Sequence, residues 1–185
     1  MPSSASQRSV RSDAVANRER LLAEAEVYFA ERGLDASLHE LVARAGFGIG
    51  TLYRHFPTHG DLIRALHDRQ VERIDLVVEQ LENAESGWDA LVGYIDGALA
   101  VFRELPAAAA VGERMSRTDP TSVLGARWAA ALTPHVERAK AEGRLRADVD
   151  GDDVALIPFL LAGAVRLPES ARERQRAIIL DGLRG

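Results

Sequence analysis

The stretch Gly46-Phe47-Gly48-Ile49-Gly50-Thr51-Leu52-Tyr53-Arg54-His55-Phe56 decides the fold, because a tight glycine-bearing turn leads into a short helix rich in polar side chains. Upstream, residues 37–45 predict another short helix, in which Ser37 caps the first turn and Glu40 completes a capping box. Two short helices joined by a turn that contains Gly predict a helix-turn-helix, whose second helix enters the DNA major groove.

Composition is that of a globular protein and excludes several kinds of site. Apolar residues make up 46% of the 185 residues and charged residues 28%, as in a domain with a sizeable core. Cysteine is absent, which excludes disulfides, thiolate zinc sites and thiol nucleophiles. The most apolar run, residues 154–165, contains Pro158 and is too short to cross a bilayer. The N-terminal region has no long apolar stretch, so we expect a cytoplasmic protein.

Charge is distributed unevenly along the chain. The net charge is -5, yet acidic and basic residues balance at seven each through Pro57. The excess of acid therefore lies downstream of the predicted helix-turn-helix. A neutral segment is compatible with DNA binding through few phosphate contacts. Its basic residues are all arginine, which reads guanine bidentately where lysine acts as a point charge.

Apolar residues follow helical spacing along the whole chain. From Val15 the pattern predicts a first helix that ends at Gly33. Thr58 and Asp61 form a capping box that opens a long fourth helix. Further helical segments follow and no strand pattern competes with them, so the chain is predicted to be all-α with about nine helices.

The chain divides into three parts by this pattern. Residues 1–13 are rich in Ser and Arg and contain little that can be buried, which predicts a mobile arm. The alternative is an arm that enters the minor groove, as in homeodomains. Residues 14–58 form the predicted DNA-binding domain, and residues 59–185 form a second helical domain.

The order of residues 21–66 resembles the TetR family of transcriptional regulators. The matching segments are Glu31-Arg32-Gly33, Ser37, Leu41-Val42-Ala43-Arg44-Ala45-Gly46, Thr51-Leu52-Tyr53-Arg54-His55-Phe56 and Asp61-Leu62. The resemblance implies a homodimeric regulator, and we expect a repressor that a small apolar effector releases from an inverted-repeat operator. Gly48 departs from the family's usual Ser or Thr cap, and His59 departs from its usual phosphate-contacting Lys.

The resemblance also implies which side chains meet DNA. Leu52 and Phe56 are expected in the core, whereas the polar residues of so short a helix cannot all be buried. His39, in the first turn of the preceding helix, is either a DNA contact or simply exposed. The residues expected at phosphates are Ser37, Thr51, Tyr53, His55 and His59, and those expected at base edges are Ile49, Gly50 and Arg54.

Large side chains of the second domain are candidates for an effector pocket. They recur at helical spacing, which is equally typical of a packed core. The resemblance implies a ligand pocket in this domain, and Pro158 marks a place where helix packing can open. The candidate effector-binding residues are Trp88, Tyr94, Phe102, Met115, Trp128, His135 and Phe159.

Residues 153–183 are the predicted dimer surface. In the family the last two helices form a four-helix bundle with a second subunit, and small residues would let these helices approach closely. The apolar residues expected there are Val154, Ile157, Leu161, Val165, Ile178, Ile179 and Leu183.

Metal and enzyme sites have little support in the sequence. His55 and His59 have i, i+4 spacing, but Pro57 breaks the helix between them. Acidic residues 148–153 alternate like the start of a calcium loop, whose later positions require Gly and Glu and here hold Asp153 and Phe159. We expect no metal and no cofactor. No grouping of nucleophile, base and orienting residue indicates an enzyme. The other alternative is an effector-independent helix-turn-helix DNA-binding or interaction protein.

Overall fold

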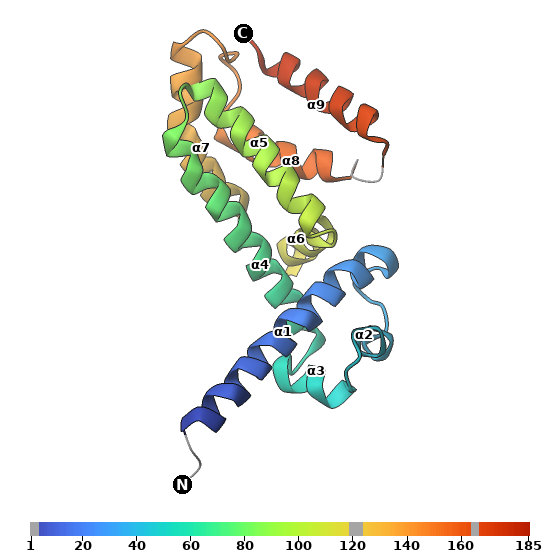
Figure 1. The fold of residues 1–185 in the computed structure, drawn as a ribbon. Helices are drawn as coiled ribbons and strands as arrows, with labels where there is room; N and C mark the ends of the chain where they lie inside the picture. Colours follow the sequence, from blue (N-terminus) through green and yellow to red (C-terminus); the bar gives the residue numbers. More distant parts are fainter. Residues whose placement is uncertain (1–3, 119–123, 164–166) are drawn as a thin grey trace.

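The computed structural model describes residues 4–118, 124–163 and 167–185 (Figure 1). These ranges contain nine α-helices and one 3-10 helix without any strand, which confirms the predicted all-α class. None of the helices among them has the length and apolar character of a membrane span. The elements are α1 (Ser4–Arg32), α2 (Leu38–Ala45), α3 (Ile49–His55), α4 (His59–Gln80), η1 (Leu81–Asn83), α5 (Gly87–Glu104), α6 (Ala108–Thr118), α7 (Leu124–Ala141), α8 (Gly151–Ala162) and α9 (Glu169–Leu183).

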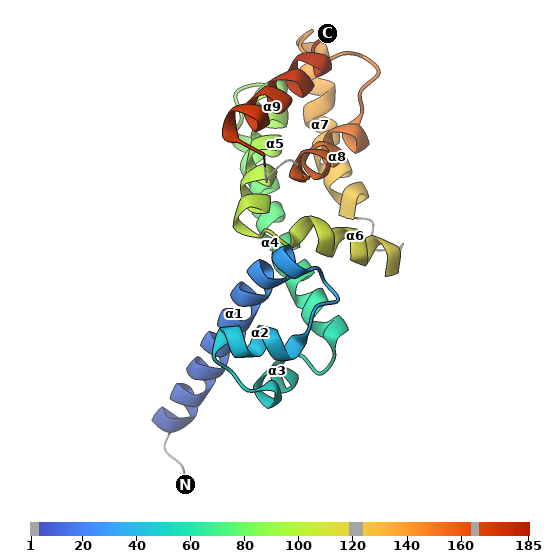
Figure 2. The same cartoon turned by 90° about the vertical axis from the view of Figure 1, so that its right-hand side faces the viewer.

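The helices form two groups that α4 connects. Helices α1, α2 and α3 make a head at one end of the molecule, and α5, α7, α8 and α9 make a body at the other (Figure 1). Helix α6 crosses the molecule between them, as the turned view also shows (Figure 2). Within the body, α7 packs against both α8 and α5, and α9 packs against α8.

The head folds around the stripe that the sequence places on α1. Leu21, Leu22, Ala25 and Phe29 are buried at helical spacing against α2, α3 and the start of α4. Gly46 ends α2 with φ of 73°, a left-handed conformation that favours glycine. We call this apolar cluster the head core; its main members are Leu21, Leu22, Tyr28, Phe29, Leu41, Val42, Leu52, Phe56, Leu62, Ile63 and Leu66.

Residues 4–13 are helical, and the mobility predicted for residues 1–13 stays a prediction. The structure begins α1 at Ser4, so the expectation that the helix starts near Val15 is wrong. The segment from Ser4 to Asp13 contains no Gly or Pro. A helix already nucleated by packed residues downstream extends through such a segment, because each added residue gains a backbone hydrogen bond.

The two predicted capping boxes have different outcomes. At α4, Thr58 Oγ1 accepts the Asp61 N–H at 3.1 Å and Asp61 Oδ2 accepts the Thr58 N–H at 2.9 Å, as predicted. At α2, Ser37 makes no side-chain cap, so the predicted box is wrong. The Tyr28 hydroxyl lies 3.0 Å from Glu40 Oε2 and 3.0 Å from the Ser37 carbonyl oxygen. Glu40 is therefore held by α1 and does not close the cap.

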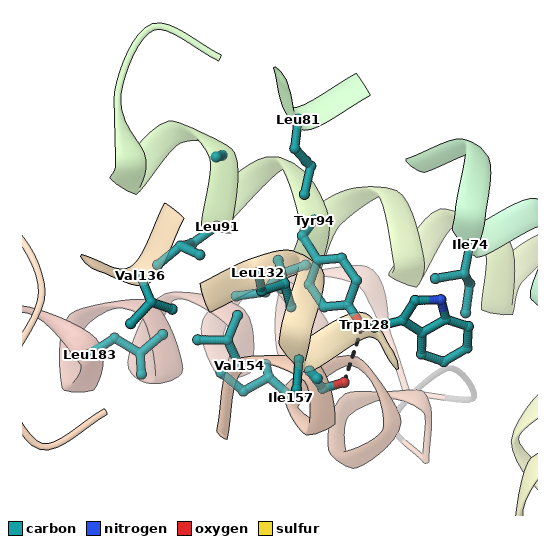
Figure 3. Packing of buried hydrophobic residues seen from close by; sticks show 14 of the residues in the cluster. Ile74, Leu81, Leu91, Tyr94, Trp128, Leu132, Val136, Val154, Ile157 and Leu183 are labelled. Atoms are coloured by element: carbon teal, nitrogen blue, oxygen red, sulfur yellow. Dashed lines mark hydrogen bonds between the residues drawn. The ribbon is translucent and has the colours of Figure 1, made fainter. Parts of the chain in front are cut away.

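The body has its own apolar cluster, which we call the body core (Figure 3). Tyr94 is fully buried there and its hydroxyl donates a hydrogen bond to the Ala155 carbonyl at 3.1 Å. The Trp128 indole N–H donates to Asp75 Oδ1 on α4 at 3.1 Å, which fixes α7 against α4. The main members of the body core are Ile74, Leu81, Trp88, Leu91, Tyr94, Ile95, Phe102, Trp128, Leu132, Val136, Val154, Ile157, Leu161 and Leu183.

The segment that leads into α6, together with α6 itself, contacts both cores. Ala107, Val111 and Met115 pack in the head core, whereas Ala108 packs in the body core. A buried carboxylate adds a polar contact, because Glu26 Oε2 on α1 accepts the Ala107 N–H at 3.1 Å. The segment that leads into α6 therefore links the body core to α1 in the head.

Candidate nucleic-acid interface and effector region

Helix α3 presents one face to the head core and another to solvent. Leu52 and Phe56 are buried, as predicted. Tyr53 is 45% exposed and Arg54 is also exposed. This arrangement orients polar side chains outward from a fixed apolar base, which is the geometry of a recognition helix.

The remaining predicted base-edge residues lie at the start of α3. Gly50 is exposed and no atom lies within 4 Å of the position that a Cβ would occupy. Ile49 is half-buried and packs against the head core, so only part of its side chain faces outward. Thr51 is half-buried. Ser37 and His39 are exposed at the first turn of α2, next to α3 in the helix-turn-helix.

The two histidines at the end of this surface turn partly inward. His55 Nε2 and His59 Nε2 are both buried, and neither has a hydrogen-bond partner among the described residues. The His59 ring lies 5.7 Å from the Phe29 ring. Burial lowers the pKa of His55, and the nearby cations Arg54 and Arg18 lower it further. Phosphate contacts by these residues remain predictions.

Two arginines of α1 support the turn, and the sequence reasoning missed both. The Arg18 guanidinium lies 5.3 Å from the centre of the Phe56 ring. The Arg20 guanidinium lies 4.8 Å from the centre of the Phe47 ring, and its Nη2 donates to the Ala45 carbonyl at 3.3 Å. Both arginines lie beside the apolar stripe of α1. Their position in the sequence, close to the buried residues Leu21 and Leu22, could have indicated that they contact the head core.

Only three of the seven candidate effector residues form one cluster of rings. The Phe102 and Phe159 ring centres lie 5.1 Å apart, edge to face, and those of Trp128 and Phe159 lie 6.1 Å apart, stacked. Tyr94 is also in the body core, but its hydroxyl is bonded to Ala155. These rings lie in or against the body core, and whether an effector contacts them stays a prediction.

The other three candidates lie elsewhere. Met115 packs in the head core because α6 turns that face toward α1. Trp88 lies at the start of α5, where Arg184 is 4.7 Å from its ring centre. His135 is half-buried; burial and Arg138 lower its pKa, and Glu82 opposes them. The seven candidates therefore do not lie in one place, because α5 and α7 each pass several parts of the body, and their role in effector binding stays a prediction.

The predicted dimer surface is also redistributed. Val154, Ile157, Leu161 and Leu183 are buried in the body core and cannot face a second subunit in this conformation. Ile179 is partly buried against that core, and Val165 lies outside the described residues. The exposed apolar side chains on these helices are Ile178 and two that we did not expect, Leu156 and Leu160. Because α8 carries apolar residues on more than one face, their spacing in the sequence does not show which face is buried and which is exposed.

Charged residues do not gather into a metal site in the described part of the chain. No group of three or more His, Cys, Asp or Glu residues there is arranged to hold an ion. Asp150 and Asp153 instead form a capping box at α8, in which Asp150 Oδ1 accepts the Asp153 N–H at 3.0 Å.

Comparisons with known proteins agree with this architecture. Residues 21–66 match the family model described as bacterial regulatory proteins, tetR family. The HTH-type transcriptional regulator SAR0097 of Staphylococcus aureus (strain MRSA252) is 33% identical over 85 residues, which is 44% of each chain. The alignment therefore spans less than half the length of this curated relative.

Two solved structures match over nearly their whole length. The TetR transcription regulatory protein from Mycobacterium vanbaalenii is 36% identical with a TM-score of 0.57, and the match covers 95% of this chain and 99% of that one. TetR transcriptional regulator SCO0520 from Streptomyces coelicolor is 30% identical with a TM-score of 0.62, covering 90% of this chain and 98% of that one. The chain therefore belongs to the TetR family of bacterial regulatory proteins.

Proposed function

We propose that this chain is a DNA-binding transcriptional regulator, and that α3 is its recognition helix. The observation that carries the proposal is the two-sided packing of α3, with Leu52 and Phe56 buried beneath exposed Tyr53 and Arg54. Family membership supports the same role. Arg54 would read a base edge, because a guanidinium donates two parallel hydrogen bonds to guanine. Ser37 and Tyr53 would contact phosphates.

The regulator would bind its operator as a homodimer. Leu156 and Leu160 are exposed one turn apart on α8, and Ile178 is exposed on α9. Large apolar side chains grouped on the surface mark an interaction site. A two-fold axis through α8 and α9 would place two recognition helices on half-sites about 34–36 Å apart, or a multiple of that distance.

Light scattering tests the dimer. Leu160 is 75% exposed, so Leu160→Glu should leave the fold intact and place a charge in each half of the interface. We expect this variant to be monomeric at micromolar concentration and the parent to be dimeric. Leu76→Glu is the control, because Leu76 is also exposed but lies on α4. A monomeric parent protein would refute the paired half-site geometry.

Effector control would act through two states of the body. An effector that binds one state better shifts the equilibrium toward it, α4 moves as a lever, and the recognition helices no longer fit successive major grooves. Release from DNA would make the protein a repressor relieved by its effector. Effector-independent binding is the alternative, and the contacts of the Phe102, Trp128 and Phe159 rings with one another are the observation that favours it.

Selection of bound fragments from random DNA tests the DNA-binding function. We expect an enriched inverted repeat. Arg54→Ala should then weaken binding by about 1–3 kcal/mol and relax preference at one position of each half-site. Tyr53→Phe is the matched control variant on the same face of α3. It should weaken binding to all DNA sequences alike, because phosphate contacts carry no sequence information. A pool without enriched sequences would contradict the proposed function, and a uniform loss for Arg54→Ala would move that residue to the phosphates.

A further inference from the structure

The buried stripe of α4 is interrupted by two polar residues where the head core meets the body core. Ile63 packs in the head core and Ile74 in the body core. Between them, on the same face of the helix, lie His67 and Gln70, which are 5% and 0% exposed. Buried positions normally hold apolar side chains unless the polar group is hydrogen-bonded.

Each of these two residues has at least one side-chain atom without a partner in the described part of the chain. Gln70 Nε2, Gln70 Oε1 and His67 Nε2 are all buried without a hydrogen-bond partner among the residues that the structure describes. Leaving a buried donor or acceptor unpaired is strongly unfavourable, and most buried polar atoms in proteins have a partner. An amide with both atoms unpaired is therefore retained here at the expense of stability.

The Gln70 amide faces α6 and α8. A Cβ atom on Gly112 would lie 3.7 Å from both Gln70 Nε2 and Gln70 Oε1, and 3.6 Å from Phe159 Cε1. The amide and the edge of the ring thus lie beside Gly112, where the absence of a side chain leaves room for one methyl group. Phe159 in turn packs on Phe102 and Trp128. One side of this space is polar and the other is aromatic.

We propose that Gln70, Gly112 and Phe159 form the point at which the polar edge of the effector binds. The effector would be a neutral, flat, largely apolar molecule that carries a hydrogen-bond donor and acceptor side by side, as a lactam or a carboxamide does. A primary amide presents its own donor and acceptor side by side, so a neutral partner with an adjacent donor and acceptor satisfies both atoms at once. A charged effector would lose its hydration in this apolar surrounding. The inference rests on the proposed effector-dependent function.

Binding at this point would reach the head through α6. Gly112 faces Gln70, whereas Val111 and Met115 on the same helix pack in the head core. A molecule that widens the space at Gly112 moves α6 relative to α4. The contact between Glu26 and the Ala107 N–H then changes with it.

The test uses two probes of matched shape on the full-length protein. 2-Quinolone carries an adjacent N–H and C=O, and naphthalene has the same two-ring outline without polar atoms. We expect 2-quinolone to raise the melting temperature of the parent more than naphthalene does, and to bind at least about tenfold tighter by calorimetry. Failure of both probes to bind, or equal binding of the two, contradicts the proposal.

Two variants test whether Gln70 and Gly112 are responsible for the binding of the two probes. Gln70→Leu replaces the amide by an apolar group of similar size, so it should abolish the preference for 2-quinolone and raise the melting temperature of the free protein. Gly112→Ala makes no contact closer than 3.6 Å, so it should fold normally and weaken both probes. A merely structural Gln70 would instead give a lower melting temperature in Gln70→Leu with the preference intact, and that result would overturn the assignment.

The same experiment separates this inference from the proposed function. Operator binding by free Gln70→Leu protein should equal that of the parent, because Gln70 is remote from α3. If the parent and Gln70→Leu proteins both bind the operator and neither responds to 2-quinolone, the DNA-binding function is supported and the proposed effector class is wrong. If the free parent fails to enrich any DNA sequence, the regulatory function itself is wrong.

Discussion

The Tyr28 hydroxyl in the head core and the buried polar groups at the junction between the two cores differ in their hydrogen bonding. In the head, the buried Tyr28 hydroxyl lies within hydrogen-bond distance of Glu40 and of the Ser37 carbonyl, and it fixes the start of α2. At the junction, Glu26, His67 and Gln70 are buried, and each keeps an atom without a hydrogen-bond partner among the described residues. Satisfied buried groups rigidify a structure, whereas unsatisfied ones store free energy that a change of state can release. The Tyr28 contacts therefore fix α2 against α1, whereas the buried atoms at the junction leave hydrogen-bonding capacity that a change of state can use.

Truncation of the head core should have the largest effect. Leu52 is 1% exposed, so Leu52→Ala should lower the free energy of unfolding by about 2–5 kcal/mol. DNA binding should be lost because α3 loses its apolar base. Both tryptophans, Trp88 and Trp128, lie in the body core, so their fluorescence reports the body while far-ultraviolet circular dichroism reports all helices.

The two signals sharpen the comparison between head and body. If the regions are separately stable, the circular dichroism of Leu52→Ala should show an early transition that tryptophan fluorescence does not. Leu76→Ala, at an exposed site of α4, should leave both signals unchanged. Coincident early transitions in Leu52→Ala would mean that head and body unfold as one unit, which would contradict separate stability of the two regions.

Glu26 at the junction should make stability depend on pH. Burial raises its pKa to about 7, although the Ala107 N–H and Arg69 act in the opposite direction. The folded protein therefore holds this proton more tightly than the unfolded chain. Stability from Glu26 is fully present below the ordinary carboxyl pKa and is lost as pH rises toward 7, by on the order of 3 kcal/mol.

Urea unfolding at pH 5 and pH 8 measures this loss. Glu26→Gln keeps an oxygen for the Ala107 N–H but has no charge, so it should remove most of the difference between the two pH values. Glu19→Gln on the same helix is the control, because the Glu19 side chain is about half exposed. An unchanged pH response in Glu26→Gln would show that the junction tolerates the ionised carboxylate.

The smallest expected effect belongs to His55 at the rim of the recognition surface. Burial lowers its pKa in the free protein, so the ring is neutral at pH 7.5, whereas a DNA phosphate favours the charged form. Operator binding should then take up a proton and tighten as pH falls from about 7.5 to 6. The log-log salt slope should steepen by up to about 0.9.

Replacing His55 and His135, which are both half-buried, in separate variants checks this assignment. His55→Ala should remove the tightening, and His135→Ala in the body should not. A full pH response in the His55→Ala protein would take His55 out of the interface and leave the rigid face of α3 to Tyr53 and Arg54.

In the head, patterns within one or two helical turns of the sequence determined which residues are buried and which are exposed. The glycine turn, the periodicity of α1 and the alternation of apolar and polar residues on α3 each concern neighbours within one or two turns. For this reason buried Leu52 and Phe56 and exposed Tyr53 and Arg54 were predictable. The start of α1 was not, because extension of a helix depends on nucleation by packed residues downstream.

Tertiary structure decided the rest of the site. The sequence assigned α8 an apolar surface, but only packing against α5 and α7 determined that Ile157 is buried and Leu160 exposed. It likewise marked Phe159 as a large ring without showing that Gln70 and Gly112 lie beside it. Residues on α4, α6 and α8 meet there across some ninety positions of sequence. Sequence period reports which side of a helix is apolar, whereas the partner that covers that side depends on how distant helices pack.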